Sequence, residues 1–228
     1  MTEWLLAGAS VMGPGHYSDG TPNQDAFLTQ KLNRGFLLVV CDGMGSKRLS
    51  HIGSVMACRA VQDVISKESF YIDSRTLVES IYRRWLQLVG DRSVTEAVTT
   101  CLFCWCDDNG NARSFQLGDG LILAKKLPLP DPTSDFGNVT TGLGVSKKYS
   151  DWFINEFTLE VADGVVLMTD GISEDLHQGS EQQLLSALTF DLQNKNPRRI
   201  KKYLTKELMA WPTPNHLDDK TIAIAINR

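Results

Sequence analysis

Two apolar stretches of this chain each end in an aspartate followed by glycine. The run FLLVVC at 36–41 leads directly into Asp42. The run GVVLMT at 164–169 leads in the same way into Asp170. Uninterrupted apolar runs of this length are typical of buried strands. Because each strand ends in a carboxylate beside a small, flexible residue, we expect Asp42 and Asp170 to share one site.

The composition of the 228 residues excludes several classes of protein. Hydrophobic residues make up 42% and charged residues 22%, as in ordinary globular domains. The formal net charge of −4 gives no overall basic field that would attract nucleic acid. No run approaches the roughly 20 apolar residues of a membrane helix, and the N-terminus lacks the basic start of a signal peptide. The five cysteines lie in strand and helix patterns rather than a disulfide framework, which favours a reducing cytoplasm.

Periodicity along the chain predicts strands in hairpin-like runs and helices in pairs. We expect strands at about 2–11, 26–32, 36–42, 94–106, 112–117, 120–127, 152–159, 164–169 and 220–227. We expect helices at about 50–66, at 73–90 with Asp73 or Ser74 as N-cap, from about 181, and from Asn196. This order favours antiparallel sheets covered by helices over alternating βαβ units.

Apolar stripes mark the helix faces that we expect to be buried. They comprise Ile52, Val55, Met56, Val61, Val64 and Ile65 in the first helix, Leu77, Ile81, Trp85 and Leu88 in the second, and Ile200, Leu204 and Leu208 in the last. The basic residues around the last stripe are expected to be solvated. In the run CLFCWC at 101–106, strand alternation places Cys101 opposite Cys104 and Cys106, which argues against a zinc site there.

Acidic residues next to glycine or at strand ends are distributed over the whole chain. They are Asp25, Asp42, Asp119, Asp170 and Asp218, with Glu174 four residues after Asp170. Two carboxylates about 4 Å apart repel each other by roughly 4 kcal/mol at an effective dielectric of about 20. If these acids converge, they must take up protons or bind cations, and all-oxygen ligation suits Mg²⁺ or Mn²⁺. Each acid also has a simpler interpretation, since the Asp-Gly pairs at Asp119 and Asp163 could both be hairpin turns.

Six short motifs, taken in order, resemble those of the metal-dependent protein serine/threonine phosphatases, the PPM or type 2C family. They are PNQDAF at 22–27, VVCDGMGS at 39–46, TTCLFCW at 99–105, QLGDGLIL at 116–123, LMTDGISEDL at 167–176 and DDKTIAIA at 218–225. The residues in and around the first two motifs are most similar to a compact bacterial branch of the family. The resemblance implies an α+β fold, a four-layer α/β/β/α sandwich of two antiparallel sheets flanked by helix pairs. It implies a single phosphatase domain over residues 1–228, with a flap-like segment at 128–151.

The resemblance also implies which residues hold the metals. Asp42 would bridge two Mn²⁺ or Mg²⁺ ions, and Asp170 and Asp218 would complete the first metal site. The Gly43 carbonyl would hold the second ion, and the absence of a side chain there leaves room for a hydrated cation. Asp25 would contribute directly or through water. Asp42, Asp170 and Asp218 are therefore the expected catalytic set.

Two further features refine the expected site. Asp119 and Glu174 match positions that hold a third, weaker metal in bacterial members of the family. Many members carry an arginine before the first acidic motif that clamps the substrate phosphate, but no arginine precedes Asp25 here. His16, Lys47 and Arg48 are the cations that could replace it, although Lys47 and Arg48 also suit a solvated helix start.

The implied function is hydrolysis of phosphoserine and phosphothreonine by direct attack of a metal-bridging hydroxide. The expected partners are phosphorylated proteins in bacterial signalling, together with a cognate Ser/Thr kinase, and we expect a cytoplasmic monomer without nucleic-acid or membrane partners. The alternative is a catalytically weak phosphatase-like domain that binds a regulatory partner. An aspartyl-phosphate enzyme is excluded, because Met44 and Ile172 stand where a second acid is required two residues after the nucleophile.

Overall fold

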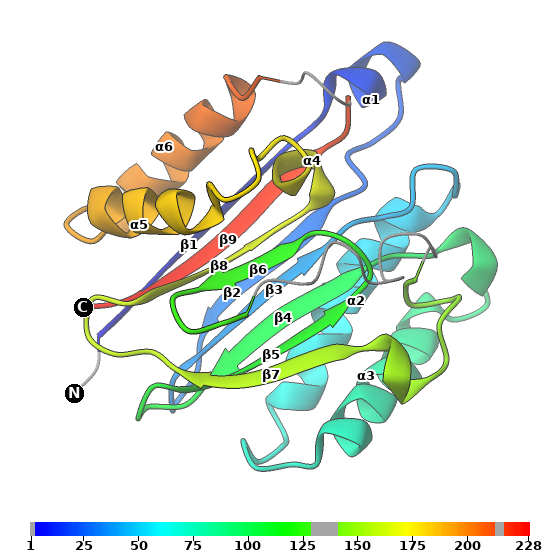
Figure 1. Cartoon of the computed structure of the whole chain (residues 1–228). Coiled ribbons are helices and arrows are strands. Elements are labelled where there is room, and N and C mark those ends of the chain that lie inside the picture. Colours follow the sequence, from blue (N-terminus) through cyan, green and yellow to red (C-terminus); the bar gives the residue numbers. More distant parts are fainter. Residues whose placement is uncertain (1–2, 129–140, 213–216) are drawn as a thin grey trace.

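The computed structural model describes residues 3–128, 141–212 and 217–228. Two antiparallel sheets pack face to face, and a pair of helices covers each outer face, so the molecule has four layers (Figure 1). This arrangement confirms the predicted α/β/β/α sandwich. Within the described residues, no helix is long and apolar enough to cross a membrane.

Each sheet combines strands from distant parts of the chain. The first sheet has the order β1 (Trp4–Val11), β9 (Lys220–Asn227), β8 (Gly164–Met168) and β6 (Leu121–Ala124). The second has the order β2 (Ala26–Lys31), β3 (Phe36–Cys41), β4 (Cys101–Cys106), β5 (Asn111–Leu117) and β7 (Phe153–Thr158). The predicted hairpin joins β2 and β3, and Gly35 adopts a φ of 91° in its turn, a conformation that favours glycine.

The long helices cover the outer faces, and shorter ones connect the strands. The helices α2 (Ser50–Ile65) and α3 (Ser74–Val89) pack on the second sheet, and α5 (Glu181–Leu192) and α6 (Pro197–Met209) pack on the first. The sequence analysis did not predict the short helices α1 (Pro14–Asp19) and α4 (Asp170–Ser173). Two 3₁₀ turns, η1 (Val94–Glu96) and η3 (Tyr149–Asp151), complete the described elements. The predicted strand at 94–106 is therefore shorter than expected.

Alternation along β4 divides its side chains between two cores. Cys101, Phe103 and Trp105 face the helices α2 and α3, whereas Cys104 and Cys106 face the other sheet. This confirms that Cys101 lies opposite Cys104 and Cys106. All five cysteines are buried and unpaired, as expected for small apolar residues.

The helix caps and two of the three apolar stripes agree with the sequence analysis. The Asp73 side chain accepts a hydrogen bond from the Thr76 backbone N–H, and Asn196 accepts one from the Arg199 N–H. The predicted stripes in α3 and α6 face inward; Leu88 is partly buried, and the others, Leu77, Ile81, Trp85, Ile200, Leu204 and Leu208, are all buried.

The predicted stripe in α2 is partly wrong, because Val55 is 51% exposed. The small residues Gly53, Ser54 and Ala57 face the interior instead. The reason is a close approach of α2 to the segment before β4. A Cβ atom on Gly53 would lie 1.9 Å from the Ala97 carbonyl oxygen. In addition, the indole Nε1–H of Trp85 donates to the Gly53 carbonyl at 3.1 Å. Val61, Val64 and Ile65 are buried as predicted, so the close approach at Gly53 accounts only for the different orientation of the first turns of α2.

The two Asp-Gly pairs at Asp119 and Asp163 are not hairpin turns. The segment at Asp119 connects β5 of the second sheet to β6 of the first, and the segment at Asp163 connects β7 to β8 in the same sense. Gly118 and Gly120 have φ values of 94° and 91° where the chain crosses between the sheets. Local turn signals cannot distinguish such a crossing from a hairpin, because both need the same backbone conformations.

Only the end of the predicted flap-like segment at 128–151 can be assessed, since residues 129–140 lie outside the described part of the chain. Leu143 is buried, and it forms two backbone hydrogen bonds with Thr99 in a short antiparallel bridge. The segment therefore returns to the body of the protein beside the strand that follows Thr99.

The packing of α2 predicts a large and a small effect on stability for two substitutions in one helix. Gly53→Ala should lower the free energy of unfolding by about 1–3 kcal/mol, because the added methyl group overlaps a backbone carbonyl. This loss should occur although alanine is the better helix former by about 1 kcal/mol. Val55→Ala should change stability by less than about 0.5 kcal/mol, as at most surface positions. Urea unfolding measures both, and a Gly53→Ala variant as stable as the wild type would contradict the close packing.

Candidate active site

Asp42 follows β3 and is fixed by two threonines that precede β4. Its backbone N–H donates to the Thr100 hydroxyl at 2.8 Å. Its carbonyl accepts hydrogen bonds from the Thr99 hydroxyl at 2.7 Å and from the Thr100 N–H at 2.8 Å. The backbone of Asp42 is thus held on both sides, and its side chain lines a cavity of about 310 Å³.

Gly43 is required by its surroundings. Its N–H donates to the Gln24 carbonyl at 3.1 Å, and a Cβ atom there would lie 2.7 Å from that same oxygen and 2.8 Å from the Ser50 carbonyl. A side chain could not be added without moving backbone atoms. Gly43 therefore places the β3 end against the segment that carries Asp25.

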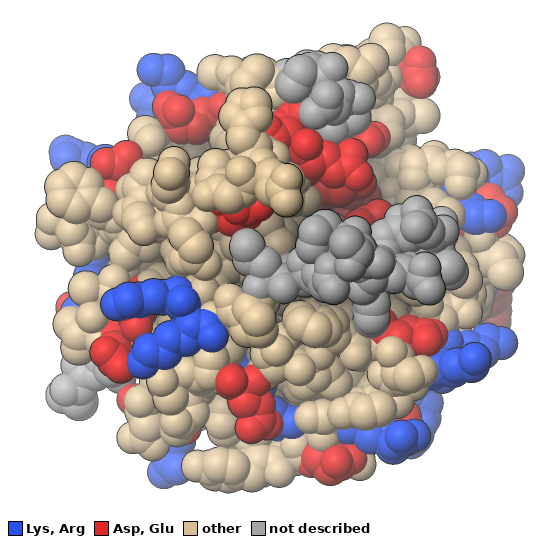
Figure 2. Space-filling view, in the orientation of Figure 1, with Lys and Arg blue, Asp and Glu red and all other residues tan. Residues whose placement is uncertain are grey.

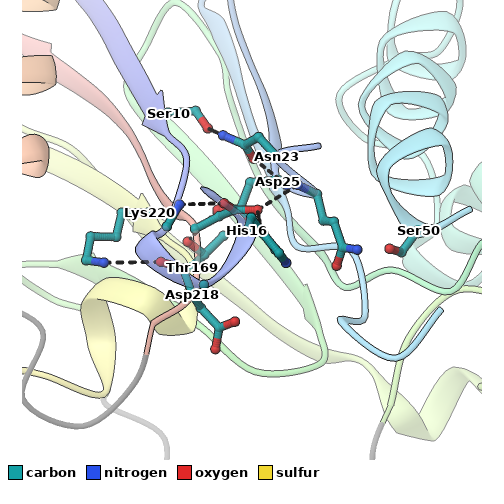
Figure 3. Close-up of polar contacts among 12 residues, drawn as sticks. Ser10, His16, Asn23, Asp25, Ser50, Thr169, Asp218 and Lys220 are labelled. Atoms are coloured by element: carbon teal, nitrogen blue, oxygen red, sulfur yellow. Dashed lines mark hydrogen bonds and ion pairs between the residues drawn. The ribbon is translucent and has the colours of Figure 1, made fainter. Parts of the chain in front are cut away.

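The strand register explains why distant acids meet. In the second sheet Ala26 pairs with Cys41, so Asp25 and Asp42 flank neighbouring strand ends. In the first sheet Met168 pairs with Ile222, so Asp170, after β8, and Asp218, before β9, lie at one end of that sheet. The Thr169 hydroxyl joins the two sheets by donating to the Asp25 Oδ2 at 3.0 Å. Figure 3 shows Asp25, Thr169 and Asp218 drawn together from these elements.

The cavity wall is acidic. Asp42, Asp119, Asp170 and Asp218 line it, and acidic side chains gather on this face of the molecule (Figure 2). Among the described residues that line the cavity, none is a lysine or an arginine. A strongly negative cavity of this kind favours cationic ligands.

Burial and mutual repulsion raise the pKa values of three of these acids. Burial raises the pKa of Asp25 to about 8, and the charges of Asp219 and Asp170 contribute in the same direction against the hydrogen bonds of Thr221 and Thr169. Burial, followed by the charges of Asp25 and Asp170, raises the pKa of Asp42 well above its usual range. Burial and the charge of Asp170 raise the pKa of Asp119 to about 6. The acids therefore form one electrostatic group.

The donor atoms fit hard divalent cations. Asp25 Oδ1 and Asp170 Oδ1 are buried and have no hydrogen-bond partner among the described residues, which is costly for a carboxylate unless a cation accompanies it. Carboxylates and a backbone carbonyl are the ligands that Mg²⁺ and Mn²⁺ prefer. Within the described part of the chain, no three His, Cys, Asp or Glu side chains are already arranged as a metal-binding group. The residues thus suit a cation chemically, although their side chains are not preformed around one.

Of the remaining predicted residues, only some lie at the cavity. His16, on α1, lines the cavity, and its Nδ1 lies 2.8 Å from Asp219 Oδ2. Glu174 follows α4, and its charge contributes to the raised pKa of Asp119. Lys47 and Arg48 are outside the set of described residues that line the cavity, where Gly45 and Ser46 take the corresponding place.

Sequence reasoning missed the supporting residues of this site. Thr99 and Thr100 occur in a quoted motif, but their hydrogen bonds to Asp42 depend on the pairing of β3 with the start of β4. Asp219 lies in the last quoted motif, but the sequence analysis assigned it no role. It proves to accept hydrogen bonds from the Gly13 N–H at 2.7 Å and the Gln24 N–H at 2.6 Å, besides its contact with His16.

The fold and the acidic cavity define a four-layer, two-sheet sandwich with a candidate divalent-cation site at one end of its sheets. The family model described as Protein phosphatase 2C matches residues 12–209, so the chain belongs to the protein phosphatase 2C family. This confirms the resemblance found in the sequence. A comparison with curated protein sequences gives no match.

Solved structures of similar fold are distant in sequence. The catalytic domain of the serine/threonine phosphatase PstP, in complex with two manganese ions, has a TM-score of 0.69 and 18% identity over 100% of this chain and 99% of that one. The serine/threonine phosphatase of S. agalactiae has a TM-score of 0.70 and 16% identity over 99% and 100%. PppA, a regulatory component of the type VI secretion system in Pseudomonas aeruginosa, has a TM-score of 0.68 and 17% identity over 99% and 98%. At these identities the likeness establishes the fold.

The raised pKa of Asp25 predicts how stability depends on pH in the presence of a chelator. The pKa of Asp25 is about 8 in the folded state and 3.8 without the fold, so the folded state binds more protons between these values. The free energy of unfolding should therefore fall as the pH rises from about 4 to about 8. Asp25→Asn can still accept the Thr169 hydrogen bond but does not titrate, so it should stabilise the protein more at pH 8 than at pH 5.

Asp63 provides a control of opposite sign. Although burial opposes it, hydrogen bonds from Arg84 and Arg59 lower the pKa of Asp63. Asp63→Asn should therefore reduce stability at pH 8. Urea unfolding at several pH values would measure both variants. A difference between Asp25→Asn and the wild type that does not change with pH would contradict the assignment.

Proposed function

We propose that this chain is a metal-dependent protein serine/threonine phosphatase that hydrolyses phosphoserine and phosphothreonine by direct attack of water on phosphorus. Membership of the protein phosphatase 2C family supports the reaction class. The observation that carries the proposal is the convergence of Asp42, Asp170 and Asp218, from both sheets, on one cavity, where Asp170 Oδ1 is buried without a hydrogen-bond partner among the described residues.

In this proposal, two tight cation sites use the acids that the two sheets bring together. Asp42 would contribute to both sites, Asp170 and Asp218 would hold one cation with it, and the Gly43 carbonyl with Asp25 would hold the other. When bound, Mn²⁺ or Mg²⁺ supplies an activated water at neutral pH and offsets the negative charge of the phosphoryl group. Structures of PstP with manganese and of RsbX with magnesium support this choice of ions by analogy.

The chain's own residues then hold and orient the reacting groups. Thr99 and Thr100 fix the Asp42 backbone, and Thr169 holds Asp25, so the ligands are restrained by neutral donors that do not neutralise them. Asp119 and Glu174 form the proposed weaker third site beside them. No side chain needs to become phosphorylated in this scheme.

The substrates in this proposal are phosphorylated proteins, with a cognate Ser/Thr kinase acting in the opposite direction. A cytoplasmic location is consistent with five buried, unpaired cysteines. The competing function is a phosphatase-like domain that binds a regulatory partner without turnover. Absence of Mn²⁺-dependent hydrolysis of any phosphopeptide, by a folded protein, would favour that alternative.

Removal of the bridging acid is the direct test of the metal proposal. With a phosphoserine peptide and Mn²⁺, wild-type turnover should be abolished by chelation and restored by added metal. Asp42→Asn should lower kcat by more than about 100-fold, because groups that only support a metal ligand already contribute about 10–100-fold. The same variant should be at least as stable as the wild type in chelator, since a repulsion is relieved.

Asp163→Asn is the matched control for Asp42→Asn. Asp163 is another buried aspartate before glycine, but it precedes β8, whereas the cavity lies beyond the other end of that strand. Its kcat per folded molecule should equal that of the wild type. Equal activity of Asp42→Asn and wild type at saturating Mn²⁺ would exclude the bridging role.

Asp119→Ala should produce a selective defect. The variant should fold normally and keep the two tight cations, but it should lose turnover on phosphopeptides, whose alkoxide leaving group needs a proton. It should lose less on p-nitrophenyl phosphate, whose leaving group is stable as an anion. The measurements are kcat on both substrates and metal content by calorimetry. An unchanged kcat on the phosphopeptide would leave Asp119 with a purely structural role between the sheets.

A further inference from the structure

A buried pair formed by His16 and Asp219 lies at the edge of the acidic cavity. The Asp219 side chain is 3% exposed and that of His16 is 16% exposed. Asp219 Oδ1 accepts the Gly13 N–H at 2.7 Å, and Oδ2 accepts the Gln24 N–H at 2.6 Å as well as the contact from His16 Nδ1 at 2.8 Å. The carboxylate is therefore occupied by donors from the segment at 13–24.

This arrangement fixes the state of the His16 ring. Asp219 Oδ2 can only accept, and it already accepts a backbone N–H, so His16 must carry a proton on Nδ1. The other ring nitrogen, Nε2, has no hydrogen-bond partner among the described residues, and the side chain lines the cavity. Figure 3 shows His16 close to Asp25 and Asp218. The ring is thus anchored at one nitrogen and leaves the other for a ligand.

The charges around the ring indicate what that ligand is. The ionisable groups that line the cavity with His16 are the acids Asp42, Asp119, Asp170, Asp218 and Asp219. Lys220 lies nearby but is not part of the lining, and its Nζ donates to the Asp218 carbonyl at 3.1 Å. A phosphoryl group in the cavity can accept hydrogen bonds from N–H donors in the cavity wall. Among the described residues that line the cavity, His16 is the only one with a basic side chain, and its Nε2 is the ring nitrogen that Asp219 does not engage.

We propose that His16, held through Nδ1 by Asp219, donates a hydrogen bond from Nε2 to a phosphoryl oxygen of the substrate and so replaces the missing phosphate-clamping arginine. This inference rests on the proposed phosphatase function. His16 is then a substrate-binding residue, and Asp219 is a positioning residue that acts through it. The substrate class that such a pair recognises is a phosphate monoester.

The first test reads the ring directly and requires neither metal nor turnover. In the metal-free protein, long-range ¹H–¹⁵N NMR of the histidine rings should report a proton on Nδ1 of His16. Asp219→Asn replaces one carboxylate oxygen by an amide NH₂ group. His16 should then no longer carry its proton exclusively on Nδ1. A wild-type ring that is neutral and protonated only on Nε2 would overturn the proposal.

The second test separates binding from turnover. His16→Gln should raise KM for a phosphoserine peptide by about 10-fold or more, as expected for the loss of a charge-assisted hydrogen bond, and should change kcat less. The inhibition constant of inorganic phosphate should rise in parallel. His16→Arg should restore most of the affinity because it supplies the charged donor. The control is His177→Gln, which alters an exposed histidine outside the cavity lining and should leave both constants unchanged.

Combining the two substitutions distinguishes positioning from a structural role. If Asp219 acts through His16, then His16→Gln with Asp219→Asn should raise KM no more than His16→Gln alone. Additive effects would assign Asp219 a separate, structural role and overturn its part in the proposal. An unchanged KM in folded His16→Gln would overturn the proposal as a whole.

The contact between His16 and phosphate can be tested even if the protein has no phosphatase activity. Should the wild type show no Mn²⁺-dependent turnover, calorimetry with inorganic phosphate on the Mn²⁺-loaded protein replaces the kinetic readout. Binding to wild type that is about 10-fold tighter than to His16→Gln would support the phosphate contact without catalysis. Equal binding to the two proteins would overturn it.

Discussion

The burial of several carboxylates at one end of the sandwich is the constraint to which the rest of the site responds. Burial is the main cause of the raised pKa values of Asp25, Asp42 and Asp119, and the negative charges of the neighbouring acids add to it. A protein that surrounded these acids with lysine or arginine would remove the repulsion but also the capacity to bind a cation. Here the Thr169 hydroxyl donates to the Asp25 carboxylate, and Thr99 and Thr100 hold the Asp42 backbone. The buried Lys220 lies nearby, but its Nζ donates to the Asp218 backbone carbonyl.

The two sheets share this arrangement, so the geometry of the cavity depends on how they pack. Asp42 lies at the end of a strand in the second sheet, whereas Asp170 and Asp218 adjoin strands of the first. Fully or nearly fully buried apolar side chains between the sheets, such as Leu38 and Leu167, fix the distance between them. Since close-packed interiors transmit small displacements, changes in this core are expected to reach the site without touching it.

The segment at 13–24, before β2, is held at the edge of the cavity by hydrogen bonds to Asp219. The buried Asp219 carboxylate ties Gly13, His16 and Gln24 to the chain just before β9. Because Asp218 precedes it directly, one dipeptide has two distinct tasks: Asp218 lines the acidic cavity, and Asp219 holds the segment that passes over its edge. Two adjacent aspartates thus have different roles because their side chains make different contacts.

The sequence alone determined the layers of the fold and most of the acidic set. Apolar runs and helical stripes predicted nearly all strands and long helices, and the motif order identified Asp42, Asp170 and Asp218. It could not place Val55, whose exposure follows from the contact of Gly53 with Ala97, nor interpret the glycines around Asp119, which carry the chain between sheets. The hydrogen bond of Thr99 to Asp42 and the contact of Asp219 with His16 could not be predicted from the sequence either. Patterns in a sequence report local conformation and burial, whereas these contacts join residues up to 203 positions apart and exist only when both sheets have packed.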